Sequence, residues 1–271
     1  MKECNARDTP TSSEAPLGTN ADGAPARYQH KWNYASVVGM MMYLASNSRP
    51  EIQFAVHQCA RFTHNFKASH EDAILRICRY LKGTTKKGLI LSPSRQMKVD
   101  CYVDSDFAGL FPYEDPHDPV CAKSRTGYVV TLAGCPLLWV SKLQTEISLS
   151  TLHAEYVALS QSLRDLLPFR RLAKEVIAGL GMNSKKLRVT TQSSVFEDNA
   201  GTIQVAKCPR LTPTSKFIAV KYHWFRSHID TRNDGTKPVS IEKIDGKVNP
   251  AGIFTKSKSK KVKFEALRKL L

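Results

Sequence analysis

A change in hydrophobic spacing near residue 97 constrains the fold of this chain more than any other feature. Before it, apolar residues recur at helical spacing in three segments: one starts at Asn33 and ends before the Arg49–Pro50 step, and the others span Glu51–Phe62 and His70–Leu81. A spacing of about 3.6 residues is typical of amphipathic helices. The first third of the chain is therefore predicted to be a compact helical region.

After residue 97 the apolar residues follow the alternating pattern of strands. We predict strands over Met97–Val103, Gly127–Ala133, Leu137–Ser141, Leu187–Phe196 and Val239–Ile244, and helices over Thr151–Leu172, Asn199–Ala206 and Val220–His228. Gly134-Cys135-Pro136 separates two of the strands and indicates a hairpin. Strands interleaved with helices predict an α/β fold with a mixed sheet flanked by helices.

These patterns divide the chain into three parts. Residues 1–30 are rich in Pro, Gly, Ser, Thr and Ala and are interpreted as a linker or a truncated edge. Residues 31–92 form the helical region, and residues 97–271 form the α/β domain with a basic C-terminal tail, KSKSKKVKFEALRKLL. That tail could hold a nucleic-acid backbone or resemble a nuclear-localisation stretch, or it could simply be a solvated basic face.

The net charge of +16 is unevenly distributed. Residues 1–97 carry +6, residues 98–200 carry −1 and residues 201–271 carry +11. Basic flanks around a near-neutral middle suit a polyanionic partner, with nucleic acid as the leading class, although solubility is the simpler explanation. The chain has no run of about 18 apolar residues for a membrane span and no secretory signal, and its seven cysteines form no CxxC pair. We expect an intracellular protein, cytoplasmic or nuclear.

Three acidic residues lie where predicted elements begin or end. Asp104 follows the first strand, Glu155 lies in the first two turns of the long helix, and Asp198 closes the fourth strand. Sites in open α/β sheets gather outside strand ends, and carboxylate oxygens suit magnesium. The simpler alternative is that these acids cap backbone donors. Asp106 and Glu197 compete for the same roles, and Asp106 could instead cap the turn that follows it.

Several longer motifs carry a family resemblance. Seven runs occur in the following order along the chain: YASVVGMMMYLASNSRPEIQFAVHQCARF, RICRYLKGTTKKGL, YVDSDFAG, KSRTGYVVTLAGCPLLWVSKLQTEISLSTLHAEYVALS, FEDNAGTIQVAK, KYHWFR and NPAGIFTK. Together they resemble the C-terminal part of copia-type LTR retrotransposon Pol polyproteins, over about residues 8–271. The resemblance implies the end of a reverse transcriptase, a helical connection and a ribonuclease H domain.

The resemblance also implies a site and its ligands. Asp104, Glu155 and Asp198 would be the first three acidic ligands of a ribonuclease H centre, holding two Mg²⁺ or Mn²⁺ ions to cleave RNA in RNA–DNA hybrids. Lys142, Lys207 and Lys221 flank the acidic motifs and are candidate nucleic-acid contacts. The reverse transcriptase portion of a longer polyprotein is a further expected partner, and no membrane is expected.

The chain departs from the family pattern at two informative positions. Gly252 stands where the family has the aspartate that is the best candidate for a fourth metal ligand, and Ala219 also replaces an aspartate. The paired aspartates of a polymerase are absent from the sequence, so no polymerase activity is expected. Three hypotheses follow: an active ribonuclease H, an impaired module that still binds nucleic acid, or a non-functional relic.

Overall fold

The computed structural model describes residues 4–13, 15–19, 23–28, 31–181, 188–189, 192–208, 210, 216–232 and 234–271. The helical elements are α1 (Tyr34–Asn47), η1 (Pro50–Ile52), α2 (Gln53–Ala60), α3 (Ala68–Gly83), α4 (Thr151–Gly179), α5 (Ala200–Lys207), η3 (Val220–His228), α6 (Gly252–Thr255) and α7 (Lys261–Arg268). The strands are β1 (Gln96–Met97), β2 (Val99–Asp106), β3 (Arg125–Leu132), β4 (Cys135–Leu143), β5 (Arg188–Val189), β6 (Ser193–Glu197) and β7 (Val239–Lys243). No helix among these residues is long and apolar enough to cross a membrane.

Five strands form the central sheet in the order β4-β3-β2-β6-β7. Strands β2, β3 and β4 pair antiparallel, whereas β6 pairs parallel to β2 and β7 pairs parallel to β6. The prediction of an α/β fold with a mixed sheet flanked by helices is therefore confirmed. The short strands β1 and β5 pair separately.

The hairpin between β3 and β4 turns one residue earlier than the sequence predicted. Ala133 and Gly134 both have positive φ, 54° and 84°, which is the backbone of a tight hairpin turn. Pro136 lies inside β4, where its missing N–H is tolerated because β4 is an edge strand and the register shifts between Val130 and Thr131.

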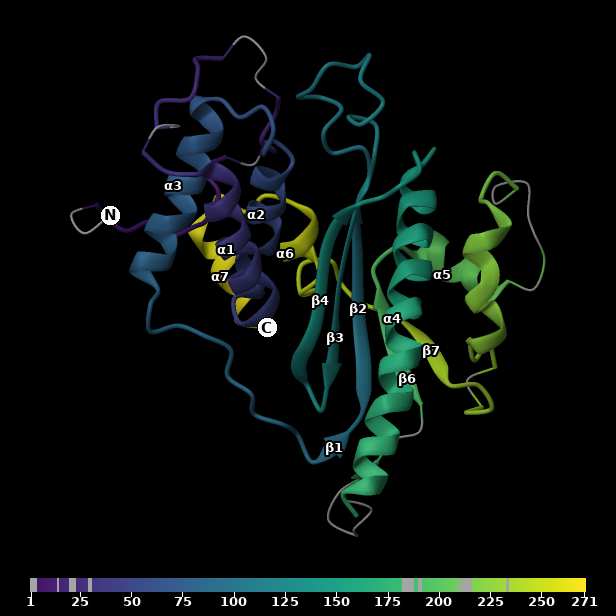
Figure 1. Cartoon of the computed structure of the whole chain (residues 1–271). Helices are drawn as coiled ribbons and strands as arrows, with labels where there is room; N and C mark the ends of the chain where they lie inside the picture. The colour runs from purple at the N-terminus through teal and green to yellow at the C-terminus, as the bar shows by residue number, and fades with distance from the viewer. Residues whose placement is uncertain are drawn as a thin grey trace.

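Helices cover both faces of the sheet (Figure 1). On one face, α4 packs against β2 and β3 and is joined by α5 and η3. Cys101, Val103, Leu159, Leu163 and Val195 are fully buried in this layer. Because side chains alternate along a strand, the odd-numbered residues of β2 face α4.

On the other face, α6 and α2 lie against the sheet, and α1, α3 and α7 join them in a second apolar core. Val129 and Trp139 supply the sheet's part of this core, and Phe264 of α7 packs edge-on against Tyr80 of α3, with ring centroids 5.6 Å apart. The C-terminal tail is therefore partly a packed helix. This core contains residues from both sides of residue 97. The predicted domain boundaries at residues 30, 92 and 97 stay predictions.

Several element ends differ from the predictions. β2 runs on to Asp106, so Asp104 lies within the strand rather than after it. α4 continues to Gly179, seven residues beyond Leu172. The segment predicted as a helix over Glu51–Phe62 begins with the 3-10 turn η1, because Pro50 sets its first residue. Part of the predicted strand over Leu187–Phe196 lies outside the described residues.

Candidate metal centre

Two of the three predicted acids are carried by neighbouring parallel strands. β2 and β6 pair at Cys101 with Val195 and at Tyr102 with Phe196. Two residues beyond the last pair come Asp104, inside β2, and Asp198, directly after β6, so the register places them side by side near the carboxyl ends of the two strands. This edge is where ligand sites of such sheets gather.

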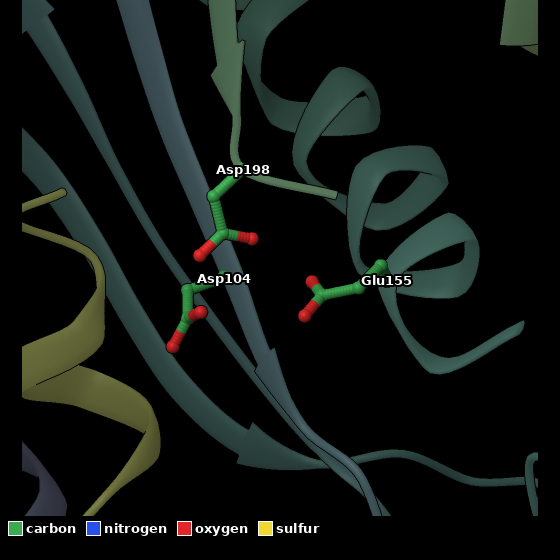
Figure 2. A group of neighbouring side chains, drawn as sticks. All are labelled: Asp104, Glu155 and Asp198. Carbon is green, nitrogen blue, oxygen red and sulfur yellow. The ribbon is translucent and has the colours of Figure 1, made fainter. Parts of the chain in front are cut away.

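The third acid comes from the helix that crosses the sheet. Ser150 caps the start of α4 by accepting a hydrogen bond from the His153 backbone N–H, and Glu155 follows in the second turn. Figure 2 shows Glu155 pointing from α4 toward Asp104 and Asp198. One oxygen of each carboxylate lies within 4.8 Å of the others. Three elements that are distant in sequence thus converge on one cluster.

Burial makes this cluster electrostatically unfavourable without a counter-charge. Asp104 and Glu155 are only 6% and 4% exposed. Burial raises the pKa of Asp104 to about 6, although Lys256 and the Thr255 hydroxyl, which donates to Asp104, act against the rise. Burial, together with the nearby Glu197 and Asp104, raises the pKa of Glu155 well above its usual range. A bound proton or cation would relieve the repulsion among these buried carboxylates.

The residues present fit a divalent metal ion. Magnesium takes hard oxygen ligands at about 2.0–2.1 Å, so two oxygens on one ion lie up to about 4.2 Å apart. The separation of at most 4.8 Å among the three carboxylates is close to that limit. In addition, Oε2 of Glu155 is buried without a hydrogen-bond partner among the described residues, as expected for a ligand atom.

The competing acids occupy different surroundings. Glu197 is fully buried, follows Val195 by two residues and therefore points to the α4 face beneath Glu155; burial raises its pKa well above the usual range. Asp106 follows Asp104 by two residues on the same face, and its carboxylate lies against Gly109 and 4.0 Å from the Lys256 ammonium. Among the described residues, the group within 4.8 Å comprises Asp104, Glu155 and Asp198, although Glu197 lies close enough to Glu155 to raise its pKa.

The short helix α6 closes the centre from the second face of the sheet. Gly127 of β3, which pairs with Asp104, has no side chain, and a Cβ there would come within 2.6 Å of Thr255 and 2.8 Å of Phe254. This close approach brings Gly252 beside the cluster: a Cβ at position 252 would lie 3.9 Å from Oδ2 of Asp104. An acidic side chain at 252 would therefore reach the metal centre.

The three predicted nucleic-acid contacts are not brought together. Lys142 and Lys221 line one hollow with Arg164, and Lys221 forms an ion pair with Glu146. Lys207 lies at the last residue of α5, outside that hollow. Sequence reasoning missed Arg125 and Lys256, although Lys256 closes the NPAGIFTK motif and Arg125 lies in KSRTGYVV. Arg125 is brought near the acids by its pairing with Asp106, and Lys256 by the packing of α6 against Gly127; no local pattern reports either contact.

Comparisons with known proteins relate the chain to Pol polyproteins of plant transposons. No protein-family model matches the chain. The chain is 31% identical, over 276 residues and 100% of its length, to the retrovirus-related Pol polyprotein from transposon TNT 1-94 of Nicotiana tabacum, of which it covers 19%. It is also 31% identical, over 198 residues and 73% of its length, to the Pol polyprotein from transposon RE1 of Arabidopsis thaliana, of which it covers 12%.

One solved structure also matches: the N-terminal RNase H domain of a Mycobacterium tuberculosis protein, solved as a fusion with maltose-binding protein. The match covers 64% of this chain and 97% of that chain, with a TM-score of 0.36 and 16% sequence identity. The chain spans less than a fifth of the length of the two polyproteins. Similarity to the tobacco polyprotein nevertheless extends over all of this chain, from the N-terminal segment to α7. The chain therefore belongs to the family of retrovirus-related Pol polyproteins of transposons and corresponds to one part of such a polyprotein.

Proposed function

We propose that this chain is the ribonuclease H part of a copia-type Pol polyprotein and hydrolyses the RNA strand of RNA–DNA hybrids. The observation that carries the proposal is the convergence of Asp104, Glu155 and Asp198, from β2, α4 and the end of β6, within 4.8 Å. The relationship to transposon Pol polyproteins supports it, because a reverse-transcribing element makes such hybrids.

In this proposal the three carboxylates hold Mg²⁺ or Mn²⁺, two ions when the ligand set is complete. Divalent ions held there supply the activation of water and the charge stabilisation that phosphodiester cleavage requires. The chain's own residues set the geometry: Thr255 orients Asp104 through its hydrogen bond, and the N-capped start of α4 fixes Glu155. Basic side chains around the centre would hold the strand by its phosphates, without reading the base sequence.

The decisive experiment is cleavage of a labelled RNA–DNA hybrid. We expect cleavage that requires Mg²⁺ or Mn²⁺ and disappears in Asp104→Asn and in Glu155→Gln, with circular dichroism confirming that both variants fold. Glu242→Gln, at an exposed position of β7, is the matched control and should cleave like the unaltered chain. Undiminished cleavage in both site variants would contradict the assignment.

A second candidate is a module of the same fold that binds hybrids and cleaves them poorly. Gly252 favours it, because a Cβ at this position would lie 3.9 Å from Oδ2 of Asp104 and the glycine supplies no carboxylate there. Tight hybrid binding without cleavage, measured under the same conditions, would select this candidate. In either case the reverse transcriptase part of a longer polyprotein is the expected partner.

A further inference from the structure

A cavity of about 410 Å³ lies beside the metal centre and is lined by an unusual concentration of positive charge. Helix α2, the loop after β2 and the segment joining α6 to α7 form its walls. Its charged lining residues are six cations and one carboxylate, namely Lys123, Arg125, Lys256, Lys258, Lys260, Lys263 and Asp106. We call this cavity the cationic pocket.

Arg125 is the most constrained of these cations. It is only 4% exposed, donates one hydrogen bond of 3.3 Å to the Ser141 hydroxyl and lies 5.2 Å above the centre of the Phe54 ring. No carboxylate of the described residues comes within salt-bridge distance of it. Burial, with Arg61 nearby, lowers its pKa to about 10, so it remains charged at neutral pH. A buried, charged guanidinium with spare donors is a strong site for an anion.

The lysines add to this excess of charge. Lys256 is 4.0 Å from Asp106, whereas the ammonium groups of Lys123, Lys258, Lys260 and Lys263 have no carboxylate within that distance among the described residues. Burial lowers the pKa of Lys258, and the nearby Asp104 and Asp106 act against this lowering. The pocket therefore concentrates positive charge that the described side chains do not neutralise.

The pocket and the metal centre share one wall. Asp106 lines the pocket and follows Asp104 by two residues on the same face of β2, a step of about 7 Å along a strand. Lys256 lines the pocket and directly follows Thr255, which donates to Asp104. A strand with one phosphate at the metal centre would thus pass a neighbouring phosphate close to the pocket.

We infer that the cationic pocket binds a backbone phosphate of the nucleic-acid strand that lies in the metal centre. This inference rests on the proposed function. The phosphate would accept hydrogen bonds from the free edge of Arg125 and from Lys258 at the inner end, while Lys260 and Lys263 attract the strand from the rim. The exposed ring of Tyr113 in the pocket wall offers a surface on which a sugar or base could rest.

The test is equilibrium binding of a fluorescent RNA–DNA hybrid in EDTA, over a series of salt concentrations. We expect the paired substitution Lys258→Gln/Lys263→Gln to weaken binding and to make the plot of log affinity against log salt shallower by about 2, since each lysine–phosphate contact contributes about 1 to the slope. The control is Lys174→Gln/Lys237→Gln, which removes the same charge near the end of α4 and before β7. Its slope should match that of the unaltered chain.

Arg125→Gln provides a second test, with a thermal melt to establish that it folds. A folded Arg125→Gln with weakened hybrid binding supports the pocket. Equal slopes for the two lysine pairs would overturn the pocket while leaving the proposed function intact. A difference between the pairs that shrinks in millimolar inorganic phosphate at constant ionic strength also supports the pocket, because free phosphate competes with the backbone phosphate for the same donors. No hybrid binding by the unaltered chain would overturn both proposals.

Discussion

At the scale of single residues, Asp104 links the metal centre to the stability of the chain. Its pKa rises from 3.8 to about 6 on folding because the carboxyl group is buried. Between these pH values the folded state binds more protons than the unfolded state, so stability falls as pH rises through that window.

We therefore predict that Asp104→Asn stabilises the metal-free chain at about pH 7 and flattens the fall in stability between about pH 4 and about pH 7. Urea unfolding in EDTA measures this effect. Adding Mg²⁺ or Mn²⁺ should restore stability to the unaltered chain and have little effect on the variant, because the variant has lost a ligand. Equal pH profiles for the two proteins would contradict the prediction.

Gly252 leads to a second prediction at this scale. A Cβ there meets only Oδ2 of Asp104 and Leu267, both at 3.9 Å, so the first atom of an added side chain has room beside Asp104. Gly252→Asp should raise metal-dependent cleavage by about tenfold or more, the range in which well-placed groups at metal sites change activity. It should also lower stability in EDTA, since a fourth carboxylate adds repulsion. Gly252→Asn, of the same size but uncharged, is the control and should not raise cleavage.

The three acids also show what a sequence can and cannot give at this scale. Element ends made Asp104, Glu155 and Asp198 candidates, and the family resemblance singled them out from Asp106 and Glu197. The choice of Asp198 over Glu197 needed more, since adjacent residues of a strand face opposite sides. Only the register of β6 against β2 places Asp198 with Asp104 and Glu197 under α4.

At the scale of elements, the position of α6 depends on one glycine of β3. A Cβ at Gly127 would come within 2.6 Å of Thr255, so α6 would have to move away from the sheet. We predict that Gly127→Ala destabilises the chain by about 1–3 kcal/mol, the usual cost of overpacking. It should also weaken divalent-ion binding, because Thr255 would be displaced from Asp104.

Gly39→Ala is the matched control for this substitution. Gly39 lies in α1, and a Cβ there meets no atom within 4 Å. Replacing a helical glycine by alanine should leave the chain unchanged or stabilise it by up to about 1 kcal/mol. Thermal melts and calcium titrations of both variants test the comparison, and equal behaviour of the two would show that α6 does not depend on Gly127.

The elements themselves were largely predictable, because amphipathic periods and turn residues are local signals. Asn33 and Asn199 cap α1 and α5 where the pattern began. The local patterns predicted the wrong strand end where long-range contacts determine it. β2 continues through three polar residues, Asp104 to Asp106, because β3 pairs with β2 up to its last residue. The placement of α6 against Gly127 likewise has no counterpart in any single segment.

At the scale of the whole molecule, the helical region and the sheet share one core. Trp139 of β4 is packed in that core and donates a 2.7 Å hydrogen bond to the Ala45 carbonyl of α1. Phe264 and Leu267 of α7 are buried there beside residues of α3. The sequence could not show this, because it placed the helices before residue 97 and the basic tail after it in separate parts. The two parts are expected to unfold together.

We accordingly predict that a fragment of residues 97–271 does not fold as a stable unit. Removing α1, α2 and α3 would uncover Val129, Trp139 and Phe264, so the fragment should bind a hydrophobic dye and show no sharp thermal transition. In the full chain, Phe264→Ala should lower the free energy of unfolding by about 3–5 kcal/mol while leaving one transition. A fragment that melts sharply at the temperature of the full chain would show instead that the sheet and α4 suffice, and that the shared core is only an interface between two independent domains.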